Sequence, residues 1–509
     1  MDESLSQNQI SNPNPVPPPA PVSPASNMPP KELLNGNIAS DQIPVAPPVE
    51  PPVAPPTPPV VPTVESVSNT GNPNKKRNII FGIILFVLLI SIVGLAGFAL
   101  TRRPSTGTKE IVWWEMWEDE SIVKPLIDEY EQSHPGIKIK YVHQDKEDYR
   151  QRLSNALTTG NNAPDIFRFH NTWVPMFKND LDNMPSSVMS PAQFVQLYFP
   201  VIQSDLGVGG AIKGLPLNFD TLALFVNEDI FETYGKSAPT NWDDLRALSK
   251  TLTIKDPSDG HIKQAGVALG RTENVDHWQE ILALMMMQNG VRMSAPNSNL
   301  AEQALLFFVQ FATRDGVWDD TQPPSTLAFA NGKLAMYFGP SWRVFEIKQK
   351  NPSLRFKVYP VPQLQKEKPE DPDITYASYW VEGVSQKSQV KPESWEFLKF
   401  ISSKESLEKL YANESKIRAF GEIYPRTDMA NLLSSDPIAG VFVRQAPFAK
   451  SWYLASRTWD GTTGINTKIS KYYQDAIGSI IAGGSGEAVT KTITSGTSQV
   501  LSEYGISAQ

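Results

Sequence analysis

The sequence predicts an α/β protein of two lobes, preceded by a disordered tail and one membrane-spanning helix. Three observations lead to this prediction. Residues 1–77 are of low complexity, Ile79–Leu100 carry no charge, and strand-like and helix-like segments alternate from Lys109 onward. The alternating part is roughly 400 residues long, which is enough for two lobes of ordinary domain size, each with its own sheet.

The tail, residues 1–77, contains 20 of the 44 prolines and no aromatic residue. Such a segment buries too little apolar surface to offset the entropy of ordering, so we expect disorder with polyproline II character. Two roles stay open for it: a spacer, or a docking site for a polyproline-binding partner.

The uncharged run Ile79–Leu100 is 22 residues long. This length crosses roughly 30 Å of hydrocarbon, and it exceeds the apolar region of a cleaved signal peptide. We therefore predict an uncleaved signal anchor over residues 78–101. Three basic residues precede the run and two follow it, which favours a cytoplasmic N-terminus and an extracytoplasmic folded part. Residues 102–108 are a short linker, so the folded part, 109–509, lies close to the membrane.

The first elements of the folded part form two successive strand–helix units. The predicted elements are strand 109–114, helix 121–132, strand 137–142, helix 145–159 and strand 165–167. Ile111 and Val112 are strand formers, Pro135 and Gly136 end the first helix, Asp145 caps the second, and Gly160 ends it. Two such units in sequence predict a parallel sheet with helices on its faces.

Beyond Gly214 the alternation continues with different lengths. The predicted strands are 222–226, 264–269, 335–338, 356–359 and 376–384, and the predicted helices are a helix starting near Trp242, then 275–289, 298–314 and 392–402. We expect Thr240 to cap the helix at Trp242. The remainder to Gln509 is expected to be mainly helical.

Composition excludes several function classes. The net charge of −8 argues against a nucleic-acid footprint, and the absence of cysteine removes disulfides, thiolate chemistry and Cys-ligated metals. The five histidines lack the zinc-hydrolase spacing, and neither a phosphate-binding loop nor a nucleophile elbow occurs. We therefore expect no metal and no cofactor. Paired carboxylates of a glycoside hydrolase have no fixed spacing, so a glycan-acting enzyme stays an alternative.

The stretch Lys109–Glu120, KEIVWWEMWEDE, places three tryptophans among five carboxylates at the end of the first strand. Binding crevices of α/β sheets lie at such strand ends. Aromatic rings stack on the apolar faces of a sugar, and carboxylates accept from its hydroxyls. The alternation of a strand predicts that Trp114 meets the ligand while Trp113 packs inside. The alternative, that these tryptophans are all core, stays open.

Several motifs in order resemble those of one family. They are Trp113-Trp114-Glu115-Met116-Trp117, His134-Pro135-Gly136-Ile137-Lys138-Ile139, Ala163-Pro164-Asp165-Ile166-Phe167, Gly214-Leu215-Pro216, Asp220-Thr221-Leu222, Asn227-Glu228-Asp229-Ile230-Phe231, Ala328-Phe329-Ala330-Asn331-Gly332-Lys333-Leu334 and Gly339-Pro340-Ser341-Trp342. Residues 109–405 thereby resemble the family 1 extracellular solute-binding proteins, the receptors of carbohydrate ABC importers, to which maltose-binding protein belongs. The last hundred residues match less clearly.

The resemblance implies a periplasmic-binding-protein fold of type II, in which two α/β lobes close on a ligand. We expect the chain to cross between lobes near 218–225 and 359–362. The N-lobe would then be about 109–219 plus 363–410, and the C-lobe about 225–357 plus much of the C-terminal helices.

The resemblance also implies a set of ligand-binding residues. They are Trp114, Glu115, Trp117, Arg168, His170, Asn171, Asp220, Trp278, Trp342 and Trp380. Aromatic residues would be platforms for sugar rings, and the polar ones would bond to hydroxyls.

The implied function is that of a membrane-anchored, extracytoplasmic receptor, not an enzyme. It would capture a sugar or oligosaccharide and deliver it, as a monomer, to the permease subunits of an ABC importer. The chain departs from the family in lacking a lipid-attachment cysteine, and the span 79–100 replaces that anchor. Two alternatives stay open: a ligand sensor or adhesin coupled to a cytoplasmic partner through the tail, and the glycan-acting enzyme.

Overall fold

The computed structural model describes residues 107–507, except residues 367 and 369. The predicted tail (1–77), the predicted signal anchor (78–101) and most of the linker lie outside the described residues. Within 107–507, no helix is both long enough and apolar enough to span a bilayer.

The first lobe is built on a four-stranded sheet with the strand order β12-β3-β1-β2. Its strands are β1 (Lys109–Glu115), β2 (Ile137–His143), β3 (Ile166–His170) and β12 (Trp380–Val384). β1 pairs in parallel with both β2 and β3, as the two strand–helix units predict, whereas β12 is antiparallel to β3. The sheet therefore combines strands from both halves of the chain.

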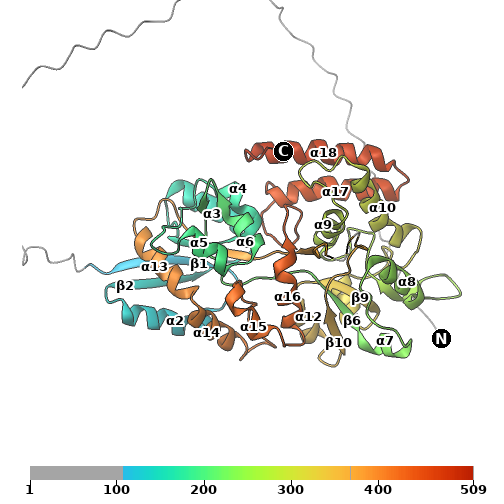
Figure 1. Cartoon of the computed structure of the whole chain (residues 1–509), viewed down its shortest axis with the longest axis horizontal. Coiled ribbons are helices and arrows are strands. Elements are labelled where there is room, and N and C mark those ends of the chain that lie inside the picture. Colours follow the sequence, from blue (N-terminus) through green and yellow to red (C-terminus); the bar gives the residue numbers. More distant parts are fainter. Residues whose placement is uncertain (1–106, 367, 369, 508–509) are drawn as a thin grey trace, which may run out of the picture. The chain divides into compact units, whose positions relative to one another are not determined.

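Helices of the first lobe come from distant parts of the sequence. They are α2 (Glu120–Ser133), α3 (Tyr149–Thr159), α5 (Pro191–Leu197), α6 (Pro200–Leu206), α13 (Lys391–Ile401) and α14 (Lys404–Glu414), with η1 (Asn171–Trp173), α4 (Val174–Phe177), β4 (Gly207–Val208) and β5 (Ala211–Ile212) in the connections. Figure 1 shows α13 and α14, in orange, beside α2, which precedes them by more than 250 residues, and the three helices are in contact. Asp119 caps α2 by accepting from the Ser121 amide at 2.8 Å.

The second lobe is built on a five-stranded sheet with the order β10-β6-β9-β8-β7. Its elements are β6 (Ala223–Asn227), α7 (Glu228–Thr233), α8 (Trp242–Leu252), β7 (Ile254–Lys255), β8 (Ile262–Val267), α9 (Trp278–Gln288), α10 (Asn299–Thr313), α11 (Ser325–Ala330), β9 (Leu334–Gly339), α12 (Arg343–Lys350) and β10 (Phe356–Tyr359). β6 and β9 are buried along their whole length, which explains their continuous apolar sequences.

Three local predictions were wrong. Asp145 accepts from the Glu147 amide in a turn, so α3 begins only at Tyr149. The cap of α8 is Asn241, whose side chain accepts from the Asp244 amide at 2.8 Å, not Thr240. The predicted strand 376–384 is two strands, because Ala377 donates its amide to Lys450 and interrupts the ladder with β3.

The chain passes between the two lobes through residues 216–222. Leu215 pairs with Glu382 of the first sheet, and Ala223 opens β6 of the second. Gln445 joins this passage to a second one near Val361. Its side-chain amide donates from Nε2 to the Leu222 carbonyl (3.0 Å), and its Oε1 accepts from the Val361 amide (2.9 Å). These passages lie near the predicted crossings, 218–225 and 359–362, and the crossings and lobe boundaries stay predictions.

The C-terminal part is mainly helical. It contains η2 (Thr427–Met429), α15 (Ala430–Leu433), α16 (Ala439–Gln445), η3 (Ala446–Phe448), β13 (Ala449–Lys450), α17 (Ile465–Ile481) and α18 (Gly486–Glu503). β13 pairs with β11 (Thr375–Tyr376), which comes earlier in the chain. In Figure 1, α17 and α18 run side by side, in red. Both pack on α10 of the second lobe, and α17 also contacts η1 of the first. This helical pair therefore touches both lobes.

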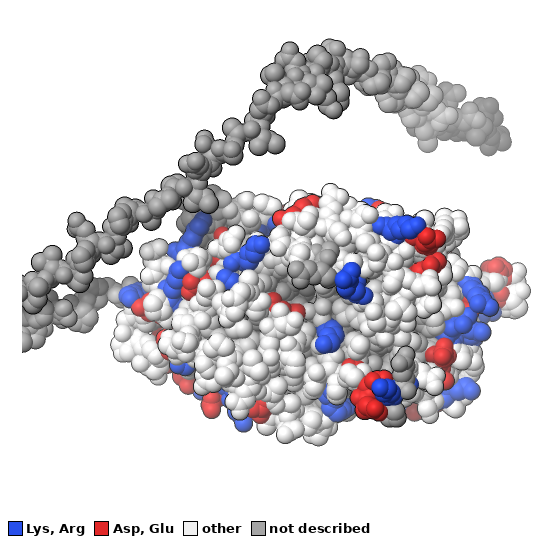
Figure 2. All heavy atoms as spheres, turned by 45° about the horizontal axis from the view of Figure 1, so that its top comes forward, with Lys and Arg blue, Asp and Glu red and all other residues white. Residues whose placement is uncertain are grey.

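Charged side chains on the face shown in Figure 2 are scattered over a mostly uncharged surface. Lysines and arginines alternate with acidic residues on this face, without a large area of one sign. The face thus lacks the basic stripe of a nucleic-acid-binding surface.

Candidate ligand-binding site

A cavity of about 300 Å³ is lined by residues from both lobes. The first lobe supplies Trp117 and Glu118 after β1, His170 at the end of β3, and Trp380 at the start of β12. The second lobe supplies His277 and Glu280 of α9, and Trp342 after β9. The site therefore lies at the carboxyl ends of β1, β3 and β9, where α/β sheets place their ligands.

Four tryptophans line this cavity: Trp117, Trp342, Trp380 and Trp459. Trp380 is half-buried, and its ring meets Trp117 edge-on at 5.4 Å and His170 at 5.1 Å. Trp117 itself is 37% exposed, so part of its ring is free to contact a ligand.

Cations lie over the two other tryptophans. The Arg343 guanidinium is 4.4 Å from the Trp342 ring centroid, and the Lys146 ammonium is 5.2 Å from that of Trp459. Trp459 adopts a positive φ of 53°, a conformation uncommon for a bulky side chain. Arg457 (φ 54°) and His277 (φ 61°) do the same, and all three line the cavity. Strained backbone of this kind collects at ligand sites.

His170 is held as a neutral donor. Burial lowers the pKa of His170 to about 3, so the ring is neutral at physiological pH. The Thr172 amide donates to Nδ1 (3.4 Å), so the proton lies on Nε2, 3.0 Å from the Ser378 hydroxyl oxygen. His170 thus leaves the Ser378 hydroxyl proton free to point into the cavity that Ser378 lines.

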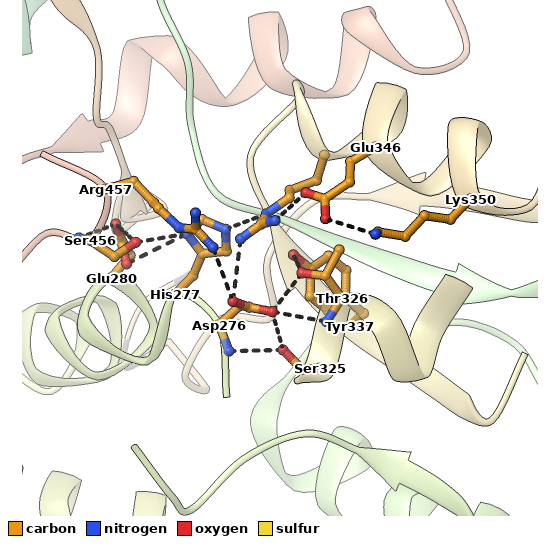
Figure 3. A network of polar contacts seen from close by, with 11 residues as sticks. Asp276, His277, Glu280, Ser325, Thr326, Tyr337, Glu346, Lys350, Ser456 and Arg457 are labelled. Atoms are coloured by element: carbon orange, nitrogen blue, oxygen red, sulfur yellow. Dashed lines mark hydrogen bonds and ion pairs between the residues drawn. The ribbon is translucent and has the colours of Figure 1, made fainter. Parts of the chain in front are cut away.

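A directional hydrogen-bond chain crosses the second-lobe side of the cavity (Figure 3). Arg343 donates from Nε to His277 Nε2 at 2.9 Å, so the His277 proton lies on Nδ1. Ser456 Oγ is 3.0 Å from that Nδ1 and donates to Glu280 Oε1 at 2.9 Å. Burial and the neighbouring Arg343 lower the pKa of His277, which keeps this ring neutral. Glu280 Oε2 is buried and has no hydrogen-bond partner among the described residues.

Asp276 orients the two arginines of this region (Figure 3). Its Oδ1 lies 3.4 Å from Arg343 and 3.6 Å from Arg457, while Oδ2 accepts from the Thr326 hydroxyl at 2.7 Å. Despite burial, Arg343 and the Thr326 donors keep the pKa of Asp276 below its ordinary value. Asp276 is therefore ionised and fixes the arginines in place.

Asp220 joins the passage between the lobes to the loop after β9. It accepts from the Ser341 amide (2.9 Å), the Ser341 hydroxyl (2.8 Å) and the Thr221 amide (2.8 Å). Burial raises the pKa of Asp220 to about 8, although these donors act in the opposite direction. Asp220 lines the cavity, but its oxygens are occupied within the protein.

Arg418 is surrounded by three carboxylates: Glu414 at 2.9 Å, Glu422 at 3.1 Å and Glu118 at 3.5 Å. Arg418, Glu118 and Glu422 line the cavity. Burial and the charge of Glu422 raise the pKa of Glu118 to about 7 and that of Glu414 to about 8. Protonation of these carboxyl groups therefore reduces the excess negative charge of the cluster.

Of the ten predicted ligand residues, the structure brings five to the cavity: Trp117, His170, Asp220, Trp342 and Trp380. The other five are Trp114, Glu115, Arg168, Asn171 and Trp278, and none of them lines it. Trp114 is only 9% exposed and belongs to the core with Trp113 and Trp278. The expectation that Trp114 meets the ligand is therefore not supported by its position. A turn beyond the strand end carries Trp117 there instead.

Glu115 and Arg168 form a buried ion-pair cluster with Glu382. Arg168 contacts Glu115 and lies 3.6 Å from Glu382, which also accepts from Trp113 Nε1 at 3.0 Å. Glu115 Oε2 accepts from the Trp117 amide at 2.9 Å. These residues thus hold the turn that carries Trp117.

Asn171 is also engaged within the protein. Its side chain donates to Asp205 at 2.9 Å, and Asp205 accepts in addition from Tyr379 at 2.8 Å. The other oxygen of Asp205 accepts from Ser451 of the C-terminal part. Because the Asn171 side chain points to Asp205, it is turned away from the cavity.

Sequence reasoning missed most of the charged residues of the site. The missed residues include Glu118, Lys146, His277, Glu280, Arg418, Glu422, Ser456, Arg457 and Trp459. Five of these follow residue 408, in the region that resembles the family least. In that region the sequence pattern that could have indicated the site is Trp459-Asp460-Gly461, where the turn-forming dipeptide Asp-Gly follows an aromatic residue. Among residues 107–507 as described, no group of three or more His, Asp or Glu side chains is arranged to hold a metal ion.

Comparison with known proteins agrees with this architecture. A binding protein of Brucella abortus (strain 2308) is 23% identical over 336 residues, which are 63% of this chain and 79% of that protein. The sugar-binding protein MalE from Xanthomonas citri has a TM-score of 0.63 at 20% identity, over 78% of this chain and 98% of that one. A cyclo/maltodextrin-binding protein complexed with maltotetraose has a TM-score of 0.61 at 16% identity, with the same coverage.

At these identities the solved structures show a common fold, the two-lobed α/β fold that we predicted. The sequence pattern of the family described as bacterial extracellular solute-binding protein matches residues 117–408, more than half of the chain. This chain belongs to the bacterial extracellular solute-binding protein family.

Proposed function

We propose that this protein is a receptor that captures a sugar or oligosaccharide between its two lobes for an ABC importer. The observation that carries the proposal is the cavity in which four tryptophans from both lobes surround fixed polar groups. Tryptophan rings suit the apolar faces of sugars, and the Ser378 hydroxyl and Glu280 Oε2 suit their hydroxyls.

Two of the similar solved structures support a carbohydrate ligand. One is named a sugar-binding protein, and the other is a cyclo/maltodextrin-binding protein that holds maltotetraose. The proteins similar to this chain are binding proteins, and in our proposal no bond of the ligand is broken. A ligand that contacts both lobes binds the closed arrangement better than the open one and thereby shifts the population toward closure.

The proposal includes a membrane anchor. Residues 79–100 form the span, the N-terminal tail lies in the cytoplasm, and the short linker holds the receptor, as a monomer, beside the permease subunits. Deleting residues 79–100 is expected to move the protein from the membrane fraction to the soluble fraction. Retention in the membrane fraction would contradict the anchor.

Isothermal titration of the purified full-length chain with a glycan panel tests the ligand class. We expect stoichiometric binding of at least one sugar and no product by chromatography. A ligand that binds only the folded state also raises the melting temperature. Turnover of the glycan would favour the enzyme alternative, and binding of none of the sugars would contradict the proposal.

A further inference from the structure

The cavity contains two cations that the protein itself leaves largely unused. Lys146 and Arg457 both line it and both are exposed. Lys146 lies in the turn between β2 and α3 of the first lobe, and Arg457 lies in the segment before α17. They therefore reach the cavity from different parts of the fold. Lys146 lies over the ring of Trp459, and Arg457 precedes Trp459 by two residues.

Lys146 has no carboxylate within salt-bridge distance among residues 107–507 as described. Its ammonium group lies over the Trp459 ring, 5.2 Å from the ring centroid. A cation over an aromatic face keeps its donors free on the opposite side, so this ammonium is able to bind an anion.

Arg457 has a single, long ion pair. Asp276 is 3.6 Å away, and this carboxylate already receives two hydrogen bonds from Thr326 and the charge of Arg343. The Arg457 side chain is 49% exposed, although its backbone is fixed at a positive φ of 54°. In Figure 3, Arg457 extends from its segment toward Asp276 and His277. Its guanidinium thus retains donors for a planar anion.

The acids of the cavity, in contrast, are engaged. Glu118 and Glu422 share Arg418, and Asp220 accepts from Ser341 and Thr221. Glu280 accepts twice from Ser456, which leaves one oxygen for a hydroxyl. Among the residues that line the cavity, the charge left available to a ligand is therefore positive apart from Glu280 Oε2.

We propose that the sugar bound here carries an anionic group, and that Lys146 and Arg457 bind this group beside Trp459. The inference rests on the proposed function and narrows its ligand class to acidic saccharides. The anion is a carboxylate, as in a uronic acid, or a sulfate ester. Both present oxygens that a guanidinium and an ammonium bind by charge-assisted hydrogen bonds.

Arg457 and Trp459 lie beyond residue 408, where the family match ends. The part of the chain outside the match therefore supplies half of the anion site and its aromatic platform. The solute class of this receptor is thus set in part by segments beyond those that define its family.

Matched pairs of saccharides test the inference by isothermal titration of the full-length chain. The pairs are an oligogalacturonide and its methyl ester, and a sulfated galactan oligosaccharide and its desulfated form. We expect one charged member to bind at least tenfold more tightly than its neutral partner, with an affinity that falls as salt rises. The pair in which the charged member binds more tightly identifies the anion as a carboxylate or a sulfate ester.

Variants locate the anion in the cavity. Lys146→Gln and Arg457→Gln are each expected to weaken binding of the charged saccharide at least tenfold and to weaken binding of the neutral partner much less. Lys140→Gln and Arg314→Gln remove one charge each from exposed positions outside the cavity and serve as controls. Melting temperatures of the four variants show whether each is folded.

The outcomes separate this inference from the proposed function. If only neutral saccharides bind, or if both variants bind the charged saccharide like wild type, the anion site is refuted and the sugar receptor stands. If no saccharide binds, charged or neutral, both proposals fail.

Discussion

Trp117 is the residue of the opening tryptophan cluster that reaches the cavity. Because Trp117 is 37% exposed and its ring forms a T-shaped pair with Trp380 that leaves part of it uncovered, the ring is available to a sugar. We expect Trp117→Ala to weaken sugar binding roughly tenfold, which corresponds to about 1.4 kcal/mol. Titration calorimetry measures the loss, and Tyr234→Ala, at an equally exposed aromatic outside the cavity, is the control. Unchanged affinity in Trp117→Ala would remove this ring from the ligand site.

Arg168 contributes to stability through the buried cluster with Glu115 and Glu382. Burial raises the pKa of Glu382 to about 7, and the charge of Arg168 opposes this rise. Arg168→Met leaves two buried carboxylates without a cation, and breaking a buried pair costs about 3–5 kcal/mol. Urea denaturation is expected to show a loss of this size in the free energy of unfolding, and none in Arg314→Met, at an exposed position. A loss below about 0.5 kcal/mol, the range of neutral surface changes, would contradict the role.

At the scale of elements, the end of α14, the loop to Glu422 and the turn after β1 each bring one carboxylate to Arg418. The folded-state pKa values of Glu118 and Glu414, about 7 and about 8, lie above the ordinary value of 4.5. At pH values between the ordinary pKa of 4.5 and the raised folded-state pKa values, the folded state binds more protons than the unfolded state. The free energy of unfolding therefore falls as pH rises. The contribution of these groups is fully present below about pH 4.5 and is lost as pH rises through 7 and 8.

We therefore expect the free energy of unfolding, measured in urea, to decrease from pH 5 to pH 8. Glu118→Gln removes one of the titrating groups and should flatten this dependence. Asp220 and Glu382 titrate in the same direction, so part of the slope will remain. A slope that is equal in wild type and in Glu118→Gln would show that Glu118 does not contribute to it.

Most elements were predictable because their signals are local. The alternation of β1, the apolar face of α2 and the Pro-Gly sequence after it all lie within a few residues of the structure they specify. The helix start at Thr240 was wrong because the neighbouring Asn241 caps α8, and the start at Asp145 was wrong because Asp145 accepts within a turn before α3. The interruption of the strand 376–384 depends on β13, which is more than 70 residues away.

At the scale of the whole molecule, Gln445 connects the two passages between the lobes. It is 3% exposed and bonds to Leu222, Thr221 and Val361. Gln445→Leu removes the partner of the buried Leu222 carbonyl and of the buried Val361 amide, at a cost of about 1–3 kcal/mol for each unsatisfied group. We expect a lower free energy of unfolding in urea. We also expect a smaller ligand-induced decrease in the radius of gyration, measured by small-angle scattering.

The control for this prediction is Gln303→Leu, at an exposed position on α10. Equal stability and equal compaction in Gln445→Leu and wild type would show that the passages do not depend on Gln445.

The sequence by itself determined the α/β class, the order of the elements, the resemblance to a solute-binding family and five of the cavity residues. These follow from short-range patterns and from motifs that keep their order along the chain. The tertiary structure alone decided that Trp117 and not Trp114 reaches the cavity, and that Glu115 and Arg168 pair with Glu382. It also decided that Arg457 and Trp459 lie opposite residues more than 170 positions earlier. The physical reason is that burial and charge pairing depend on which segments meet across the fold, and no local sequence pattern records those meetings.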